Sequence, residues 1–321
     1  MKKRCLITGG AGFIGSHLAE ELLHRGYDVT IVDNFYKGQR KYHFDLTKKI
    51  STVKASVLDK GKIEQLVQSH DVIFHLAAIL GVKSTMEKSV ELIETNFDGT
   101  RNILQAALKG QKKVVFASTS EVYGKAKPPF VEDGDRLYGG TAKIRWSYAI
   151  CKTLEETLCL SYARQGLAVT IVRYFNIYGP RAKDGPYAGV IPRFISAALQ
   201  NREVPVYGDG TQTRCFTYVT DAVEATIKAM DEKVNGEIIN IGSEHEISIQ
   251  DVAVMIQKMV QSSSDIIYVP FEEVYPDGFE EIPHRRPNVT KLTTLLQFQP
   301  KVAFEEGLQK TIAWFREEFY G

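Results

Sequence analysis

The segment "YAICK" places a phenol and an ammonium at the i and i+4 positions, as Tyr148 and Lys152. On a helix these two side chains share one face. A lysine ammonium beside a phenol stabilises the phenolate and lowers the tyrosine pKa from about 10 toward neutral pH, which would make Tyr148 a general base. The same spacing also describes a core tyrosine beside a surface lysine, so its interpretation depends on the segments that accompany it.

The segment "STSEVYG", residues 118–124, follows the apolar run "KVVFA" and places Thr119, Ser120 and Glu121 where a buried strand is expected to end. Desolvating a carboxylate that has no partner is costly, because water stabilises the charge far better than apolar surroundings do. Glu121 is therefore either a solvent-facing residue or part of a site that uses its charge.

The segment "TGGAGFIG" places Gly9, Gly12 and Gly15 in a GxxGxxG spacing, directly after a predicted strand and at the start of a helix. Such glycines permit a tight turn and close approach of the backbone to a pyrophosphate at the positive end of the helix. Asp33 ends the next predicted strand, where a carboxylate accepts both ribose hydroxyls and repels a 2′-phosphate. These features predict a dinucleotide site that prefers NAD over NADP. Asp59 is either a contact for the adenine amino group or a helix N-cap.

The overall composition excludes several classes of protein. A formal net charge of +1 over 321 residues provides no basic field for nucleic acid or a membrane surface. No apolar run approaches the roughly 18 residues of a membrane span. The four cysteines form no CxxC pair, which argues against zinc and disulfides and favours a reducing compartment. We therefore expect a cytoplasmic protein without a bound metal.

These segments require a doubly wound α/β sheet to position them. In the first half of the chain, apolar runs such as "DVTIVD" and "KVVFAS" alternate with amphipathic stretches, the pattern of a parallel sheet covered by helices. Helices are expected at 86–108 and 147–165. We predict a Rossmann-type domain over residues 1–175 and a smaller mixed α/β substrate lobe over 176–321. Residues 221–243 are expected to pack back on the first domain.

Taken in order, the glycine-rich loop, the strand-end acid, the Ser/Thr cluster and YxxxK resemble the short-chain dehydrogenase/reductase superfamily. Further segments resemble its extended branch, the nucleotide-sugar epimerases, dehydratases and decarboxylases, over essentially the whole chain. These segments are "HLAA" at 75–78, "NFDGT" at 96–100, "RYFNIYGPR" at 173–181 and "QTRCFTYVTD" at 212–221. The resemblance implies a tightly held NAD and a nucleotide-sugar substrate.

The resemblance also implies roles for individual residues. Thr119 matches the residue that hydrogen-bonds the sugar 4-hydroxyl, and Tyr148 matches the base that deprotonates it while hydride passes from C4 to NAD. Lys152 matches the residue that holds the nicotinamide ribose. The residues expected to contact the cofactor are Gly9, Gly12, Phe13, Ile14, Gly15, Asp33, Asn34, Asp59, Leu76, Ala77, Ala78, Asn96, Tyr148 and Lys152.

The residues after Thr119 distinguish the branches of this group, which share a 4-keto sugar as the first intermediate. Galactose-type 4-epimerases usually carry small neutral residues there, and glucose-type 4,6-dehydratases carry Asp-Glu. The pair Ser120 and Glu121 resembles UDP-glucuronate decarboxylases, whose "RW.Y...K" context resembles "RWSYAICK" at 145–152. "HRRPNV" also resembles a decarboxylase segment and places Arg285 at that family's arginine. We therefore expect a UDP-hexuronate decarboxylase, which is a lyase.

The chemistry of a hexuronate agrees with this expectation. Oxidation at C4 gives a β-keto acid, which loses its C6 carboxylate because the C5 carbanion is stabilised as an enolate. Ser120 would hydrogen-bond the carboxylate, and Glu121 would orient it or relay the proton to C5. Arg285 would pair with the carboxylate or act as the acid toward C5. In related epimerases an arginine near this point binds diphosphate, a role open to Arg286.

Three alternatives stay open at this point. The first is a UDP-sugar 4-epimerase, including one that acts on a hexuronate. The second is a 4,6-dehydratase, because GDP-mannose 4,6-dehydratases carry a very similar Ser-Glu loop. The third is a non-catalytic NAD-binding sensor, since fold does not fix function. The intact Thr119, Tyr148 and Lys152 argue against the sensor.

The nucleotide end of the substrate is also assigned by resemblance. Asn176 and Arg214 match positions that hold the diphosphate, and Tyr207 lies where the nucleoside packs. Arg181 would serve the substrate or the cofactor, or cap its own loop. These residues favour UDP and leave the C2 substituent, hydroxyl or acetamido, open. The family commonly forms homodimers through a four-helix bundle, which the two predicted helices of the first domain would supply.

Overall fold

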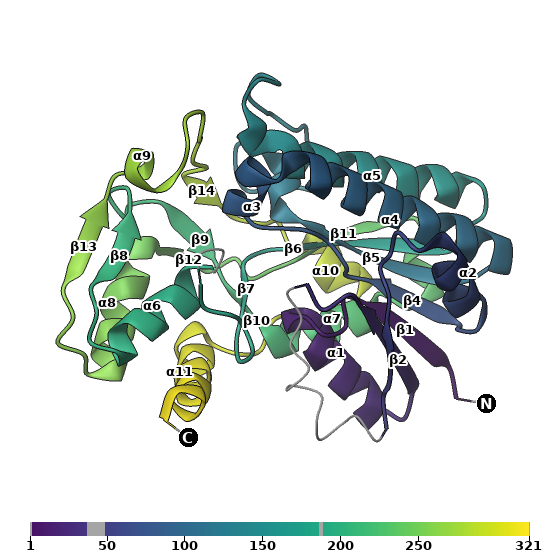
Figure 1. The fold of residues 1–321 in the computed structure, drawn as a ribbon, viewed down its shortest axis with the longest axis horizontal. Helices are drawn as coiled ribbons and strands as arrows, with labels where there is room; N and C mark the ends of the chain where they lie inside the picture. Colours follow the sequence, from purple (N-terminus) through teal and green to yellow (C-terminus); the bar gives the residue numbers. More distant parts are fainter. Residues whose placement is uncertain (1, 37–48, 186–188, 321) are drawn as a thin grey trace.

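A seven-stranded parallel sheet forms the centre of the larger lobe in the computed structural model, which describes residues 2–36, 49–185 and 189–320 (Figure 1). The strand order is β11-β6-β5-β4-β1-β2-β3, so the direction of winding reverses beside β1, where doubly wound sheets bind ligands. This confirms the predicted fold class. The strands are β1 (Arg4–Thr8), β2 (Asp28–Asp33), β3 (Ser51–Lys54), β4 (Val72–His75), β5 (Lys113–Thr119), β6 (Val169–Tyr174) and β11 (Ile238–Ile241).

Helices cover both faces of this sheet, because neighbouring strand residues point to opposite sides. On β5, Val115 packs in the core cluster shared with α1 and α7, whereas Val114 and Phe116 pack in the cluster shared with α2, α4 and α5. The helices of this lobe are α1 (Phe13–His24), α2 (Lys60–Gln68), α3 (Val82–Glu87), α4 (Ser89–Gly110), α5 (Ser147–Arg164), α7 (Val219–Lys228) and α10 (Thr290–Leu295).

The helix expected at 86–108 is divided in the structure. Lys88 has φ −135° and ψ 40°, outside the helical region, so α3 ends at Glu87 and α4 begins at Ser89. The helix expected at 147–165 is observed as α5. No helix in the part of the chain described here combines the length and apolar character needed to cross a bilayer.

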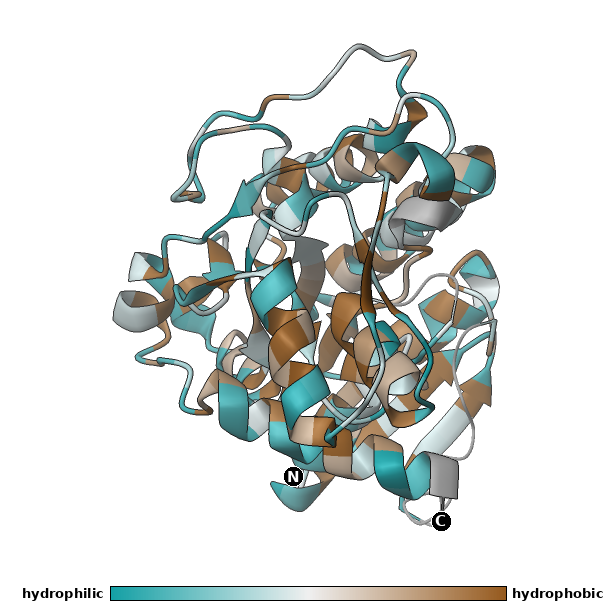
Figure 2. Ribbon diagram, turned by 90° about the vertical axis from the view of Figure 1, so that its left-hand side faces the viewer, coloured by the Kyte–Doolittle hydropathy of each residue, from teal (hydrophilic) through white to brown (hydrophobic). Residues whose placement is uncertain are grey.

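The smaller lobe contains short strands and three longer helices, at the left of Figure 1. Its strands form a three-stranded sheet, β12-β9-β14, and a parallel pair, β13-β8. Seen from this side, the helices carry hydrophobic and hydrophilic residues together, as amphipathic surface helices do (Figure 2). The elements are β7 (Ile177–Tyr178), β8 (Val204–Tyr207), β9 (Thr213–Cys215), β10 (Thr217–Tyr218), β12 (Glu246–Ser248), β13 (Ile266–Val269), β14 (His284–Arg285), α6 (Val190–Leu199), α8 (Ile249–Val260), α9 (Phe271–Val274) and α11 (Phe304–Tyr320).

A buried ion pair joins the sheet to the helix that carries "YAICK". Arg173 on β6 donates to both carboxylate oxygens of Glu156 on α5, at 2.8 and 2.7 Å. Ser118 at the end of β5 donates to the same carboxylate at 2.5 Å, and Arg173 also donates to the Tyr123 hydroxyl at 2.7 Å. The loop that follows β5 is therefore fixed relative to α5 by a single buried carboxylate and its donors.

Replacing Arg173 with methionine (Arg173→Met) tests this role. The change leaves Glu156 without its bidentate partner in the interior, and such losses cost about 3–5 kcal/mol of the free energy of unfolding. Chemical denaturation followed by circular dichroism measures the difference. The matched control is Lys310→Met, which removes the exposed Lys310–Glu306 pair and should change stability by less than about 0.5 kcal/mol. Equal effects of the two changes would contradict the structural role of the buried pair.

Candidate active site

The glycine-rich loop and the acid of the predicted dinucleotide site lie together at the carboxyl edge of the sheet. Asp33 Oδ2 accepts from the backbone N–H of Ala11 at 3.0 Å, so the carboxylate faces the loop that follows β1. Gly9 has φ +68°, and a Cβ at this position would lie 2.9 Å from the backbone nitrogen of Ala77. Only glycine fits this backbone and this close approach. The loop and "HLAA" therefore form one backbone cradle, as a pyrophosphate requires.

The remaining residues predicted for the dinucleotide site either lie at the carboxyl edge of the sheet or make hydrogen bonds that stabilise the local backbone. Asn96 on α4 accepts from the backbone N–H of Ile79 at 2.7 Å and donates to its carbonyl at 2.9 Å, fixing the segment after β4. Asp59 caps α2, accepting from the backbone N–H of Lys62 at 3.1 Å, which is the second of its two predicted roles. Asn34 Oδ1 accepts from the N–H of Tyr36 at 3.0 Å. Gly12 precedes α1, which contains Phe13, Ile14 and Gly15, and Leu76, Ala77 and Ala78 follow β4.

The hydroxyl and phenol groups predicted for catalysis are brought together. Thr119 is the last residue of β5, and its hydroxyl accepts from the backbone N–H of Glu121 at 3.2 Å, capping the 3₁₀ helix η2 (Ser120–Tyr123). The Tyr148 phenol, in the first turn of α5, lies near the same hydroxyl, which acts to lower the pKa of the phenol. Ser120 is buried beside them. The end of β5 and the start of α5 therefore present two hydroxyls and a phenol at one point.

The expectation that Lys152 lowers the pKa of Tyr148 is not met. Burial raises this pKa, and the negative charges of Glu155 and Glu121 raise it further. The Lys152 ammonium donates to Glu155 Oε2 at 3.0 Å and lies 4.0 Å from the centre of the Phe116 ring. Its charge is thus largely compensated by a carboxylate that the sequence interpretation did not consider.

Glu121 is not a solvent-facing residue, because both of its carboxylate oxygens are held by arginines. Arg145 Nη2 donates to Oε2 at 2.8 Å, and Arg285 Nη1 donates to Oε1. The two arginines are themselves buried. Burial alone would raise the pKa of Glu121, but the charges and hydrogen bonds of the two guanidinium groups lower it to about 2. Glu121 is therefore an ionised carboxylate at neutral pH.

Arg145 is a site residue that sequence reasoning missed. It lies in the short 3₁₀ helix η3 (Ile144–Trp146), immediately before α5, and its side chain is only 2% exposed. The spacing in the sequence could have indicated this residue. Arg145 precedes Tyr148 by three residues, so the two side chains lie within about one turn of each other. The quoted segment "RWSYAICK" thus supplies three groups to this site, where only the phenol and the ammonium were predicted.

The predicted substrate arginines lie on adjacent strands of the smaller lobe. Arg285 on β14 is paired in register with Arg214 on β9. Arg214 donates to the carbonyl of Thr213 at 2.7 Å and pairs with Glu281. Burial and the neighbouring positive charge of Arg285 lower the pKa of Arg214 to about 10. The edge of this sheet therefore presents two adjacent guanidinium groups, one of which reaches Glu121 in the larger lobe.

Two consecutive carboxylates anchor the segment before β14 to both lobes. Glu280 accepts from Trp146 Nε1 at 2.8 Å and pairs with Lys143, both near η3. Hydrogen bonds from Lys143 and Trp146 lower the pKa of Glu280 to about 2. Its neighbour Glu281 instead holds Arg214 on β9. This anchoring fixes the approach of β14, and therefore of its arginine, to the end of α5.

The other predicted substrate residues have separate surroundings. Asn176 donates to the carbonyl of Cys215 at 2.9 Å. Tyr207 lies under the guanidinium of Arg193, 3.8 Å from the ring centre, an arrangement that sequence reasoning did not identify. Arg181 pairs with Glu20 on α1 at 2.7 Å, which favours a role in holding its loop over contact with a substrate.

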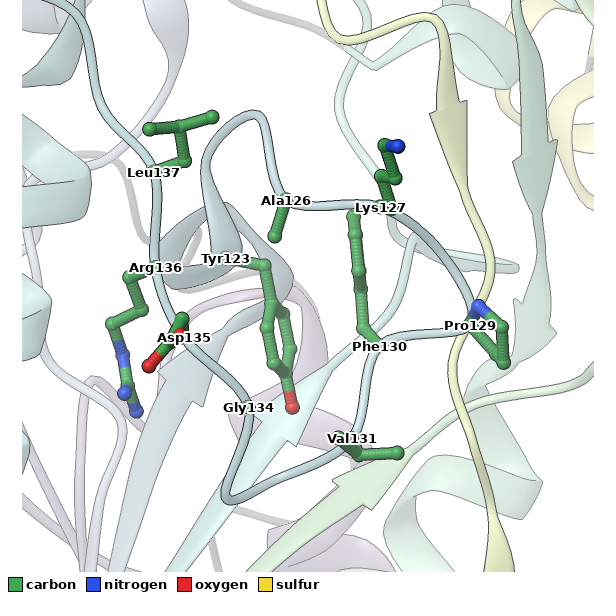
Figure 3. Close-up of a pocket in the computed structure, with 10 residues that line it drawn as sticks. All are labelled: Tyr123, Ala126, Lys127, Pro129, Phe130, Val131, Gly134, Asp135, Arg136 and Leu137. Carbon is green, nitrogen blue, oxygen red and sulfur yellow. The ribbon is translucent and has the colours of Figure 1, made fainter.

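A separate cavity of about 550 Å³ lies in the loop that follows η2 (Figure 3). The rings of Tyr123 and Phe130 stack in it, with centres 4.6 Å apart. None of the predicted catalytic residues lines it, so it is not the candidate active site. Within the described ranges, no cluster of His, Cys, Asp and Glu residues is arranged to hold a metal ion. The cavity is lined by Tyr123, Ala126, Lys127, Pro129, Phe130, Val131, Gly134, Asp135, Arg136 and Leu137.

Replacing one arginine should change the titration of Glu121. In the variant Arg145→Met, the carboxylate keeps only Arg285 as a cationic partner, so its pKa should rise by about 1–3 pH units. NMR spectroscopy of protein with ¹³C-labelled glutamate carboxyl groups measures the change, with the resonance assigned through Glu121→Gln. Arg136→Met is the matched control, because Arg136 pairs with Glu156 and should leave the Glu121 titration unchanged. An unchanged titration in Arg145→Met would contradict the arrangement described above.

Comparison with known proteins gives a family match and several relatives. Residues 5–242 match the model of the NAD dependent epimerase/dehydratase family. The chain is 76% identical over 317 residues to UDP-N-acetyl-alpha-D-glucosaminuronate decarboxylase of Bacillus cytotoxicus, covering 99% of both chains. It is 36% identical over 322 residues to UDP-glucuronic acid decarboxylase 1 of Xenopus tropicalis, covering 99% of this chain and 73% of the relative.

A solved structure supports the same relationship. The UDP-glucuronic acid 4-epimerase from Bacillus cereus, in complex with UDP-glucuronic acid and NAD, superposes with a TM-score of 0.86. The two sequences are 30% identical, and the match covers 98% of this chain and 99% of the epimerase. The architecture is therefore shared with 4-epimerases, whereas the high sequence identity is to a decarboxylase.

Proposed function

Since this chain belongs to the NAD dependent epimerase/dehydratase family, we propose that it is an NAD-dependent decarboxylase of UDP-N-acetyl-α-D-glucosaminuronate. The observation that carries the proposal is the 76% identity to a decarboxylase of this substrate along 99% of both chains. The arrangement of Glu121 between two arginines, beside Thr119 and Tyr148, supplies a chemical reason for it. The 2-acetamido substrate, rather than UDP-glucuronate itself, follows from that relative.

NAD is the cofactor, and the residues at the carboxyl edge of the larger lobe fit it. The Gly9 backbone leaves no room for a side chain beside Ala77, and the Asp33 carboxylate is positioned for the ribose hydroxyls. Bound NAD would supply a hydride acceptor for the oxidation of C4 of the sugar and, as NADH, the donor for its later reduction. The protein's own groups then have two tasks, which are moving the proton of the 4-hydroxyl and controlling the C6 carboxylate.

Tyr148 performs the first task in this proposal. The Thr119 hydroxyl, at the end of β5 and beside the start of α5, would hold the sugar 4-hydroxyl against the phenol. In this proposal Tyr148 takes the hydroxyl proton as C4 is oxidised and returns it when C4 is reduced, which requires bound cofactor and substrate to lower the phenol pKa that burial and the neighbouring carboxylates raise. Lys152 holds the nicotinamide ribose and is fixed within the protein by Glu155.

The arginines perform the second task. The 4-keto hexuronate is a β-keto acid, so breaking the C5–C6 bond gives CO2 and an enolate. Arg145 and Arg285 are donors suited to a carboxylate, and Ser120 adds a hydroxyl. Because Glu121 has a pKa of about 2, it is a poor proton donor at neutral pH. Burial acts to lower the pKa of Arg285, but the charge of Glu121 raises it above the ordinary arginine value, so Arg285 is also a poor acid. We therefore assign Glu121 the role of orienting the two guanidinium groups, and assign water the protonation of C5.

The nucleotide end of the substrate is assigned to the smaller lobe, which we propose spans residues 176–321 apart from the returning segment 221–243 and the helix α10, which pack on the larger lobe. Arg214 has its guanidinium beside Arg285 and would hold the diphosphate. Tyr207, with Arg193 stacked above it, offers an aromatic face to the nucleoside. In this proposal the UDP-sugar lies across both lobes, with its nucleotide on the smaller one and its sugar at the catalytic group.

The proposed reaction is tested by incubating the pure protein with UDP-N-acetylglucosaminuronate and, separately, with UDP-glucuronate. We expect loss of one CO2 and formation of a UDP-2-acetamido-pentose, measured by mass spectrometry and NMR, with the 2-acetamido substrate used at least about 10-fold more efficiently. Tyr148→Phe should retain NAD and lose at least about 100-fold in rate, because the general base is removed. A product of unchanged mass with inverted C4 would identify a 4-epimerase instead.

We also propose that the protein is a cytoplasmic homodimer, assembled through α4 and α5. These helices pack side by side on one face of the sheet (Figure 1). Their outer surface carries apolar side chains, including Val90, which is 68% exposed, and Leu154, which is 51% exposed. Exposed apolar surface on two adjacent helices is what a four-helix bundle between two subunits would cover.

A charge placed on this surface should separate the subunits. Leu154→Glu would bury a carboxylate in the bundle, and light scattering coupled to gel filtration should show the mass of a monomer where the unmodified protein shows a dimer. Leu295→Glu is the control, because Leu295 is exposed on α10, away from these helices. A monomeric unmodified protein would refute the proposed dimer.

A further inference from the structure

A continuous chain of buried polar side chains connects the catalytic helix to the segment after β4 that contains Ala77, and the steps above use only its first link, the pair of Lys152 and Glu155. Lys152 and Glu155 on α5 form a pair at 3.0 Å. Thr100 on α4 lies 2.6 Å from Glu155 Oε2 and 3.0 Å from His75 Nε2. His75 Nδ1 lies 2.7 Å from the hydroxyl of Thr8, the last residue of β1. All of these side chains are at most 3% exposed.

The donors and acceptors along this chain have one consistent direction. Thr100 donates its hydroxyl proton to Glu155, so its oxygen is free to accept from His75 Nε2–H. Burial lowers the pKa of His75 to about 3, so the ring is neutral and carries only that proton. His75 Nδ1 therefore accepts from the Thr8 hydroxyl, whose oxygen accepts from the backbone N–H of Ala77 at 3.1 Å. Each proton points toward Glu155.

This direction makes Glu155 the anionic end of the chain and Lys152 its counter-ion. The Lys152 ammonium is also held against the face of Phe116 on β5, so it has a carboxylate on one side and an aromatic ring on another. The other oxygen of Glu155 is approached by the Cys151 thiol, with sulfur 3.4 Å away. Glu155 contacts the catalytic lysine and is connected by hydrogen bonds to the segment that contains Ala77. It can therefore determine the position of the lysine relative to that segment.

We propose that Glu155 is a positioning residue for the reaction proposed above, fixing the Lys152 ammonium relative to Ala77 through Thr100 and His75. The inference rests on the proposed function in that Tyr148 and Lys152 are taken as the catalytic pair. The charge of Glu155 has a second effect on that pair, because Glu155 follows Tyr148 by about two turns on the same face of α5 and so opposes ionisation of the phenol.

The groups that face Tyr148 define this second effect. Burial raises the pKa of Tyr148, followed by the charges of Glu155 on α5 and Glu121 on η2, with a smaller contribution from Cys151. The hydrogen bond with Thr119 on β5 acts in the opposite direction. Removing the Glu155 charge therefore lowers the pKa of the phenol. The ionised base then persists to lower pH, and the acid limb of the activity profile moves the same way.

The test compares the full-length holoenzyme with its Glu155→Gln variant. We expect kcat to fall about 10- to 100-fold with little change in KM, because the ammonium is displaced rather than removed. The acid limb of kcat/KM should move down by about one pH unit. NMR spectroscopy of protein with ¹³C-labelled tyrosine, with the Tyr148 resonance assigned through Tyr148→Phe, should show the phenol ionising at lower pH than in the unmodified protein.

The NMR measurement needs no substrate, so it separates this inference from the reaction itself. If the unmodified protein does not decarboxylate the UDP-sugar but Glu155→Gln shifts the Tyr148 resonance, the reaction is wrong and the charge effect stands. If the reaction occurs but the Tyr148 titration and the pH profile of Glu155→Gln equal those of the unmodified protein, the inference is overturned.

Two further variants distinguish charge from packing. Glu155→Asp keeps the charge and shortens its reach, so it should retain the Tyr148 titration while lowering kcat, and it keeps the test available if the glutamine variant does not fold. Burial raises the pKa of the Cys151 thiol to about 12, so Cys151→Ala removes an uncharged group beside Glu155 and should leave kcat and the acid limb of the pH profile unchanged. Equal losses of kcat in Cys151→Ala and Glu155→Asp would mean that the helix tolerates no change here, and would overturn the positioning role.

Discussion

Three carboxylates beside the candidate active site, Glu121, Glu155 and Glu156, are buried or largely buried, and the structure around the site depends on how each is neutralised. A buried charge without a partner is strongly destabilising, whereas one with hydrogen-bonding cations is tolerated. Glu121 and Glu156 have cationic partners on other elements, so satisfying these two charges also fixes those elements, whereas Glu155 pairs with a lysine on its own helix. The pairs are Glu121 with Arg145 and Arg285, Glu155 with Lys152, and Glu156 with Arg173.

Each of these pairs has a different structural role around α5. The Glu156 pair attaches the helix to the sheet, and the Glu155 pair fixes the ammonium that follows the catalytic phenol in sequence. The Glu121 group joins the two lobes, because Arg145 comes from the larger lobe and Arg285 from the smaller one. The same low-dielectric surroundings that make unpaired charge costly also strengthen the pull of these cations on an anionic substrate. The buried ion pairs thus stabilise the fold and also supply the cations that would attract the substrate.

The fold could be predicted from local patterns, because buried parallel strands and glycine-rich turns are encoded by neighbouring residues. The division at Lys88 was missed, since an apolar periodicity continues across it while the backbone does not. The surroundings of Glu121 could not be read in the same way. Its partners lie 24 and 164 residues away, so only the tertiary structure decides between solvent and a buried site. Arg193 was missed for the same reason, as its contact with Tyr207 joins α6 to β8.

The bridging of one carboxylate by two arginines has a consequence for how such sequences diverge. Loss of Glu121 would leave two buried guanidinium groups facing each other, and loss of either arginine would leave the carboxylate with a single donor. A substitution at one of these three positions should therefore be tolerated only when the other two are substituted as well. In related proteins that catalyse a different reaction, all three positions should be substituted together. An alignment of such proteins should therefore show covariation between positions that are far apart in the chain.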